Sequence, residues 1–182
     1  MEQKDYNLEI VNELIKSENY ARNMARNLGT NHTTVVRKLK ELSEENVVDF
    51  NLKGRNKVYF LKKSAEAKTY IYNAENYKLK QILKKYPSLR KIIEDIHKNK
   101  RIKLAILFGS YAKGIAKSRS DIDIYIDTIN KQIKQEIQGI DSNLSVKIGK
   151  YDRNNLLIKE IEKNHVIIKG VEQYYEKNKI FD

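Results

Sequence analysis

The stretch from Leu104 to Ile126 limits most strongly what this chain can fold into. It opens with five apolar residues, 104–108, a run long enough for a buried strand and short for a helix. The run stops at Gly109-Ser110, and a loop rich in Lys, Arg, Gly and Ser follows. Acidic and aliphatic residues then alternate over 121–126, which is the period of a half-buried strand.

This alternation brings two carboxylates together. Asp121 and Asp123 are two residues apart, so on a strand both point to one face, while the aliphatic side chains between and after them point to a core: Ile122, Ile124 and Ile126. Two like charges this close raise each other's energy unless a cation lies between them. A hard ion such as Mg²⁺ binds carboxylate oxygens and keeps positions open for phosphate. We therefore expect Asp121 and Asp123 to bind Mg²⁺.

The residues between the two strands favour a phosphate ligand. Glycine lets the backbone approach a phosphate closely, and free N–H groups and a serine hydroxyl can bind it, so Gly109 and Ser110 are expected contacts. The loop adds positive charge at Lys113, Lys117 and Arg119. The alternative is an ordinary strand-loop-strand with solvated aspartates, which leaves the acidic pair without a structural role.

The whole arrangement resembles the minimal nucleotidyltransferases of the polymerase-beta-like superfamily. The resemblance rests on an apolar strand, Gly109-Ser110, ten intervening residues with Ala and Gly at 112 and 114, and Asp121-x-Asp123 on a second strand. It implies transfer of NMP from an NTP, with ATP the first choice, to a hydroxyl group with the help of Mg²⁺. It also implies a third carboxylate on a third strand, which completes one of two metal sites.

The third carboxylate is where this sequence departs from that pattern. The third expected strand reads Leu144-Ser145-Val146-Lys147-Ile148-Gly149, and the position matching the family's third acid is Lys147. A lysine would pair with the two aspartates but would not orient a nucleophile as a carboxylate does. Asp141 and Asp152 are substitutes outside the expected place. The domain is therefore either an active transferase with a displaced acid or a degenerate one that binds nucleotide without transferring it.

Composition favours an anionic partner. The 182 residues carry a formal net charge of +12, which fits nucleic acid or nucleotide, although a lysine-rich proteome would produce the same balance. There are no cysteines, and the three histidines lie far apart, so neither residue type indicates a metal site. With no apolar run of membrane-spanning length and no signal-peptide pattern, we expect a cytoplasmic protein.

The first third of the chain predicts three helices and a hairpin. Helices are expected over 5–17, 20–28 and from about 32 to 42, with Gly29 ending the second and Thr30 or Asn31 capping the third. The third helix is expected to bury Val35, Val36, Leu39 and Leu42. Two alternating strands, 47–51 and 56–61, flank a basic turn that contains Gly54.

Three short helices and a basic hairpin resemble a winged helix-turn-helix. The resemblance implies that the third helix enters the major groove and that the hairpin contacts the backbone of DNA. The residues expected near base edges are Asn31, His32, Thr33, Thr34 and Arg37, and those expected near phosphates are Lys38, Lys53, Arg55 and Lys57. Alternatively this face is solvated, and the domain serves dimerisation or protein docking.

The remaining elements complete an α+β chain of two domains. A long helix over 64–86 ends at Pro87, and Ser88 is expected to cap a further helix to about Lys98. After a first strand over 102–108 come a helical turn over 111–116, a strand over 121–126, a helix over 129–140 with Ile129 inward, a strand over 144–151, a helix over 154–163, a strand over 166–168 and a helix over 171–178.

We divide the chain into a winged helix-turn-helix over 1–63, a helical linker or dimerisation segment over 64–100, and a nucleotidyltransferase fold over 101–182, a mixed β-sheet flanked by helices. Three functions remain open. The first is a nucleotidyltransferase, and the second is a homodimeric DNA-binding regulator that senses nucleotide. The third is an antitoxin-like protein with a small helical toxin as its partner.

Overall fold

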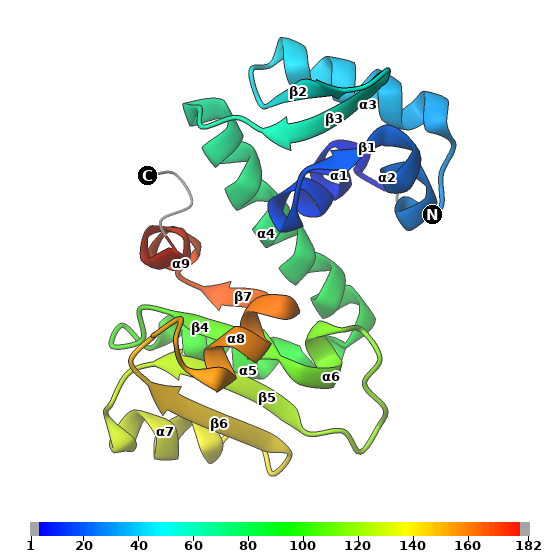
Figure 1. Ribbon diagram of the computed structural model, residues 1–182. Coiled ribbons are helices and arrows are strands. Elements are labelled where there is room, and N and C mark those ends of the chain that lie inside the picture. Colours follow the sequence, from blue (N-terminus) through cyan, green and yellow to red (C-terminus); the bar gives the residue numbers. More distant parts are fainter. Residues whose placement is uncertain (1–3, 179–182) are drawn as a thin grey trace. The chain divides into compact units, whose positions relative to one another are not determined.

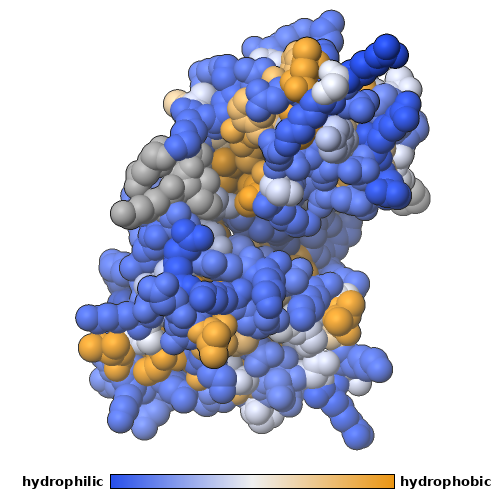
Figure 2. All heavy atoms as spheres, viewed as in Figure 1, coloured by the Kyte–Doolittle hydropathy of each residue, from blue (hydrophilic) through white to orange (hydrophobic). Residues whose placement is uncertain are grey.

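The computed structural model describes residues 4–178 and divides the chain into two compact units, 1–77 and 78–182. Helix α4, Ala65–Lys85, contributes residues to both. The α+β fold class predicted from the sequence is confirmed, because helices accompany a separate sheet in each unit. Figure 2 shows hydrophilic residues over most of the viewed face of each unit, with separate apolar patches.

The first unit has the elements of a winged helix (Figure 1). In chain order these are α1 (Tyr6–Lys16), β1 (Asn19–Tyr20), α2 (Ala21–Leu28), α3 (His32–Glu44), β2 (Val48–Lys53) and β3 (Asn56–Leu61). The three strands form an antiparallel sheet in the order β1-β3-β2. The strand β1 was not expected, since Tyr20 was predicted to begin a helix. Tyr20 instead pairs with Val58 of β3, and α2 begins at Ala21.

Local capping interactions set where the helices of this unit begin and end. Asp5 caps α1 by accepting from the backbone N–H of Asn7 and Leu8 at 3.1 and 3.2 Å, and Gly29 closes α2 in the left-handed conformation. On α2 the buried residues are Ala21, Met24, Ala25 and Leu28. They pack with Val35, Leu39 and Leu42 of α3, so the core of this unit is the one that the helical spacing predicts.

One predicted core residue lies outside. Val36 was expected in the buried stripe of α3, but 39% of it is exposed. The reason is angular, because successive helical residues are about 100° apart and Val36 shares its face with His32 and Lys40, four residues away on each side. Both are exposed, so the buried stripe is narrower than predicted.

The second unit is a four-stranded mixed sheet with helices on both faces. Its strands are β4 (Ala105–Phe108), β5 (Ile122–Asp127), β6 (Leu144–Gly149) and β7 (Val166–Lys169), in the order β6-β5-β4-β7. Only β5 and β6 run parallel. After Pro87–Leu89, a 3-10 turn, the helices are α5 (Arg90–Lys98), α6 (Gly109–Ala112), α7 (Lys131–Gln138), α8 (Leu156–Lys163) and α9 (Val171–Asn178).

One face of this sheet carries an aliphatic core. Ile122, Ile124 and Ile126 of β5 pack with α5 and α7, as the alternation predicts. The opposite face is also covered, because Tyr125 is 2% exposed and its ring contacts Tyr151. Figure 1 shows α8 on the side of the sheet away from α5. The strand that carries the acidic pair is therefore buried on both faces beyond Asp123.

Several predicted boundaries in this unit shift by a few residues. Asn130 caps α7 by accepting from Gln132 N–H at 2.9 Å, so Ile129 lies before the helix and is 72% exposed rather than inward. Ser88 does not cap α5, because it lies inside the 3-10 turn and Leu89 occupies the cap position without a side-chain bond. The strand β4 begins at Ala105 rather than at Ile102. The helical turn that follows it, α6, begins at Gly109 rather than at Tyr111.

Candidate active site and nucleic-acid face

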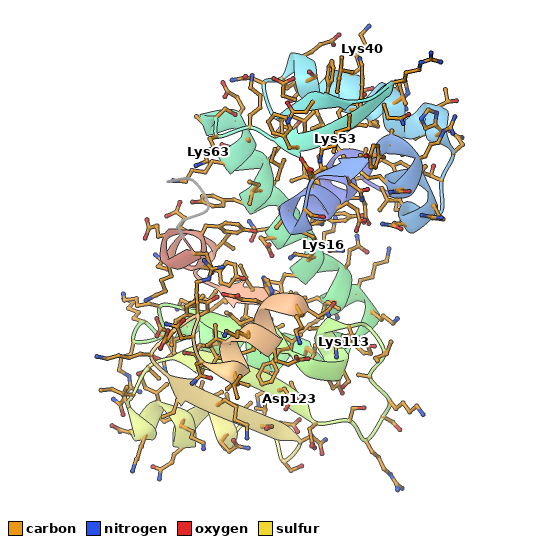
Figure 3. The ribbon with its side chains drawn as sticks, viewed as in Figure 1. Lys16, Lys40, Lys53, Lys63, Lys113 and Asp123 are labelled. Atoms are coloured by element: carbon orange, nitrogen blue, oxygen red, sulfur yellow. The ribbon has the colours of Figure 1, made fainter. Side chains whose placement is uncertain are left out.

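The candidate active site lies where β4 ends against β5. Phe108, the last residue of β4, is the register partner of Asp123, and Gly109 begins α6 directly afterwards. Figure 3 labels Asp123 and, from the segment after α6, Lys113. Gly109, which with Ser110 is an expected phosphate contact, therefore lies next to Asp123. The pairing of β4 with β5 brings these residues together.

Gly109 and Asp123 fit each other closely. Gly109 has φ of +70°, and a Cβ added to it would lie 2.4 Å from Asp123 Oδ2. Left-handed backbone disfavours any side chain, and this contact leaves no room for one. The glycine is therefore required twice, by its conformation and by the carboxylate that lies against it.

Asp123 is partly withdrawn from solvent, and its neighbours act on it in opposite directions. Burial is the largest cause that raises the pKa of Asp123, and the charge of Asp121 raises it further. A hydrogen bond from the Ser145 hydroxyl and the ammonium of Lys147 lower that pKa. Asp121 is exposed and lies immediately before β5. The two carboxylates therefore interact, and a cation is already among their neighbours.

The position expected for the third carboxylate holds Lys147, and Ser145 lies two residues before it on the same strand. In the parallel register Ser145 is opposite Asp123, and Lys147 is opposite Tyr125 on the same face. Sequence reasoning missed Ser145 as a partner of Asp123. The signal for it is the spacing of Ser145 and Lys147, two residues apart on a strand next to β5.

The two substitute acids occupy turns. Asp141 lies at the same end of β5 as Asp121, because Asn143 O accepts from Ile122 N–H at 2.8 Å, but its Oδ1 accepts from Asn143 N–H. Asp152 follows the opposite end of β6 and caps a turn through Asn154 N–H. About six residues of strand separate the two ends, roughly 20 Å. Within residues 4–178 no group of three or more His, Cys, Asp or Glu side chains could hold a metal.

The two aspartates nonetheless fit one magnesium ion. Mg²⁺ is commonly bound by one or two carboxylates together with phosphates of the substrate. The raised pKa of Asp123 is the electrostatic situation that a bound cation would relieve. A second ion would need a further carboxylate, and the described part of the site supplies Lys147 and Ser145 instead.

The cations of the intervening loop lie between α6 and Asp121. Lys117 and Ser120 bond each other across a tight turn that directly precedes Asp121, with Lys117 N–H donating to Ser120 Oγ at 2.9 Å. Lys113, Lys117 and Arg119 are exposed, and Lys85 donates to Gly114 O at 2.6 Å. Sequence reasoning assigned no role to Lys85, because it is distant in the chain.

The predicted DNA-contacting residues lie on α3 and on the hairpin of the first unit. His32, Thr33 and Arg37 are exposed. Asn31 is the N-cap of α3, and its Oδ1 accepts from Thr34 N–H at 2.7 Å, so the two have a structural role. Arg55 lies at the two-residue turn between β2 and β3, and Figure 3 labels Lys53 on this hairpin.

Several of the predicted cations are already paired. Arg37 and Lys38 both bind Glu41, at 2.7 and 2.6 Å, and Lys53 pairs with Glu18. Lys57 stands over the ring of Phe50 at 3.9 Å from its centroid. Exposed ion pairs of this kind contribute little and exchange readily for a phosphate.

Two comparisons with known proteins found similarities to this chain. Residues 90–174, which lie within the second unit, match the family model described as polymerase beta, nucleotidyltransferase. The chain is also similar to the crystal structure of the transcriptional repressor BigR from Xylella fastidiosa, at 19% identity. That similarity covers 37% of this chain and 67% of the other, with a TM-score of 0.35.

No protein with a curated description matches the sequence. Among residues 4–178, no helix is long and apolar enough to cross a membrane.

Proposed function

We propose that the second unit binds an NTP, with ATP the first choice, and transfers its NMP group to a hydroxyl acceptor. The observation that carries this proposal is the carboxylate of Asp123 lying against Gly109 at the end of β4. That contact joins an acidic pair to a Gly-Ser corner, and the family match over residues 90–174 supports the same reaction class.

Each residue has a distinct part in this proposal. Gly109 and Ser110 hold the terminal phosphates, while Lys113 and Arg119 add positive charge to the triphosphate. Asp121 and Asp123 are the catalytic pair and would hold Mg²⁺, which when bound neutralises phosphate charge and orients the reacting groups. The Ser145 hydroxyl fixes the orientation of Asp123. The acceptor oxygen bonds to the α-phosphorus, the bond to the β-phosphate oxygen breaks, and pyrophosphate leaves.

A transfer assay with α-labelled NTP tests this reaction. Asp123→Asn should lower label transfer by at least about 100-fold, since positioning and charge neutralisation carry most of this catalysis. Asp152→Asn is the matched control, because it makes the same change at the far end of β6. Equal labelling by wild type and Asp123→Asn would remove Asp123 from the active site.

A second function is nucleotide binding without transfer, and Lys147 favours it. An ammonium near Asp123 replaces part of the charge of a metal ion but cannot activate a hydroxyl group while it is protonated. Calorimetry separates the two functions. Magnesium-dependent NTP binding that Asp123→Asn abolishes, together with no label transfer to any acceptor, would establish the degenerate domain.

For the first unit we propose binding to duplex DNA through α3 and the hairpin. The segment 20–63 has ten Lys and Arg against four Asp and Glu, and the exposed face of α3 carries His32, Thr33 and Arg37. Electrostatic binding of this kind weakens steeply as salt rises. Arg37→Ala should weaken duplex binding about 5- to 100-fold in a gel-shift titration. Salt-insensitive binding would contradict the proposal.

A homodimer and a small helical protein partner remain predictions from the sequence. Sedimentation of the purified chain would detect the first. Co-purification of a second small protein from the native source would detect the second.

A further inference from the structure

A groove of about 560 Å³ lies within the first unit, between α3 and the hairpin. Its walls come from β1, the beginning of α2, α3 and β3, and its polar and larger apolar residues include Arg22, His32, Val36, Asn56, Lys57 and Tyr59. The volume is within the usual range for a small-molecule site. His32 and Lys57 are also predicted duplex contacts, whereas Arg22, Asn56 and Tyr59 have no part in the proposed binding of duplex DNA.

Tyr20, Ala21, Val36 and Tyr59 form the apolar part of the groove. Val36 is the residue that helical spacing wrongly placed in the core, and here its exposed surface lines the groove. Tyr59 is half-buried, and burial raises the pKa of its phenol. Its ring contacts Phe50 of β2 with centroids 5.7 Å apart, so the aromatic surface continues along the hairpin.

The polar part of the groove is basic. Arg22 and Lys57 form no ion pair with any residue in the described range 4–178, whereas Arg37, Lys38 and Lys53 each pair with a glutamate. Lys57 instead stands over the ring of Phe50. Two cations without a carboxylate partner therefore line this groove, next to an aromatic ring and the amide of Asn56.

A planar aromatic group attached to an anion matches this lining. We propose that the groove binds an unpaired nucleotide of a single-stranded nucleic acid. The base stacks on Tyr59 against Val36, and its phosphate lies between Arg22 and Lys57. Base stacking of this kind tolerates any sequence, because every base offers a flat face. Asn56 supplies a hydrogen-bonding amide to the edge of the base.

A single strand fits better than a duplex or a free nucleotide. In a duplex the faces of the bases are covered by their neighbours, so only edges and phosphates reach a protein. A free nucleotide would use the groove but not the cations beyond it, such as Arg55 at the turn of the hairpin. A single-stranded nucleic acid that leaves the groove along the hairpin would contact both the groove and Arg55.

The test uses the full chain and a single strand of about twelve nucleotides that contains 2-aminopurine, whose fluorescence falls when it stacks. Binding should quench the fluorophore. Tyr59→Leu should weaken binding at least about fivefold and remove most of the quenching at saturation, while Tyr59→Phe keeps both. Because Tyr59 is half-buried, thermal melting of each variant establishes that the fold is intact.

Substitutions of exposed residues supply a second test of single-strand binding, because they leave the core of the unit unchanged. Lys57→Gln should weaken single-strand binding and reduce its salt dependence more than Lys16→Gln, which makes the same charge change on α1 outside the groove. Leu52→Ala, on the same hairpin and 68% exposed, should leave binding within about twofold.

Three outcomes would overturn the inference. They are unchanged single-strand binding by folded Tyr59→Leu, tight binding to duplex alone without quenching, and equal affinity for a mononucleotide and the longer strand. The proposed duplex function fails separately, when Arg37→Ala leaves duplex binding unchanged. A loss confined to single strands in Tyr59→Leu and a loss confined to duplex in Arg37→Ala would support both proposals.

Discussion

At the scale of single residues, the site depends on how little space surrounds Asp123. Its carboxylate lies against Gly109 on one side, accepts from Ser145 on the next strand, and feels the charges of Asp121 and Lys147. These groups come from three separate stretches of sequence. The pair of aspartates could be predicted from its spacing alone, but Ser145 and the close approach of Gly109 depend on the register between strands.

Gly109→Ala should destabilise the protein more than Gly54→Ala. Both glycines have positive φ, +70° and +64°, so alanine costs about 1–2 kcal/mol at either position. At Gly109 the added Cβ also meets Asp123 Oδ2, whereas nothing lies within 4 Å of it at Gly54. Denaturant unfolding of the two variants measures the difference. Equal losses would mean that Asp123 moves aside without cost.

Asp123→Asn should raise the melting temperature at neutral pH while it removes activity. The raised pKa of Asp123 means that the folded protein accommodates the ionised carboxylate less well than the unfolded chain does. The contribution of Asp123 to the stability of the wild type is therefore fully present below the unfolded value, about 3.9, and is lost as pH rises through the folded pKa. Asparagine stays neutral, so we expect a gain of roughly 1–4 °C at pH 7.

The pH dependence is the control for this prediction. The gain in melting temperature of Asp123→Asn over the wild type should shrink as the pH is lowered. It should disappear below about pH 4, where Asp123 is protonated in both the folded and the unfolded state. An advantage that is constant over this range would point to the lost hydrogen-bond geometry with Ser145 rather than to charge.

At the scale of elements, most helices and strands could be predicted because their signals are local. Asn31 and Gly29 mark the ends of α3 and α2, and period-two alternation marks β2, β3 and β5. The errors occurred where burial depends on neighbours. Val36 and Ile129 are both apolar and near helical registers, yet 39% of Val36 and 72% of Ile129 are exposed, which the spacing along one helix does not reveal.

Asn31→Ala should destabilise α3 by about 1 kcal/mol, the usual effect of losing an N-cap. Asn31 Oδ1 accepts from Thr34 N–H at 2.7 Å, and alanine leaves that donor without its partner. Asn31→Ser retains a capping oxygen and is the matched control. Because Asn31 is also a predicted base contact, duplex binding that falls in Asn31→Ser, with stability unchanged, would separate the two roles.

At the scale of the whole molecule, each unit has its own sheet, and only part of this organisation could be read from the sequence. The hairpin of the first unit joins neighbours in sequence, so its pairing follows from a short turn. The second sheet pairs β4 with β7, about 60 residues apart in the chain, and nothing local specifies that contact. A separate pairing, of β5 with β6, places Ser145 opposite Asp123, and the local sequence does not specify that register either.

The tyrosines of the second unit have an optical consequence. Tyr125, Tyr151 and Tyr174 are in edge-to-face contact, burial raises the pKa of Tyr151 to about 12 and raises that of Tyr125, and the chain has no tryptophan to mask their signal. Tyrosines in water ionise near pH 10. The ultraviolet absorbance of tyrosinate should therefore develop in separate steps as alkali is added. Tyr70 of α4, whose pKa is also raised to about 12, contributes to the late step, so in a Tyr70→Phe variant that step reports whether the interior beside β5 is intact.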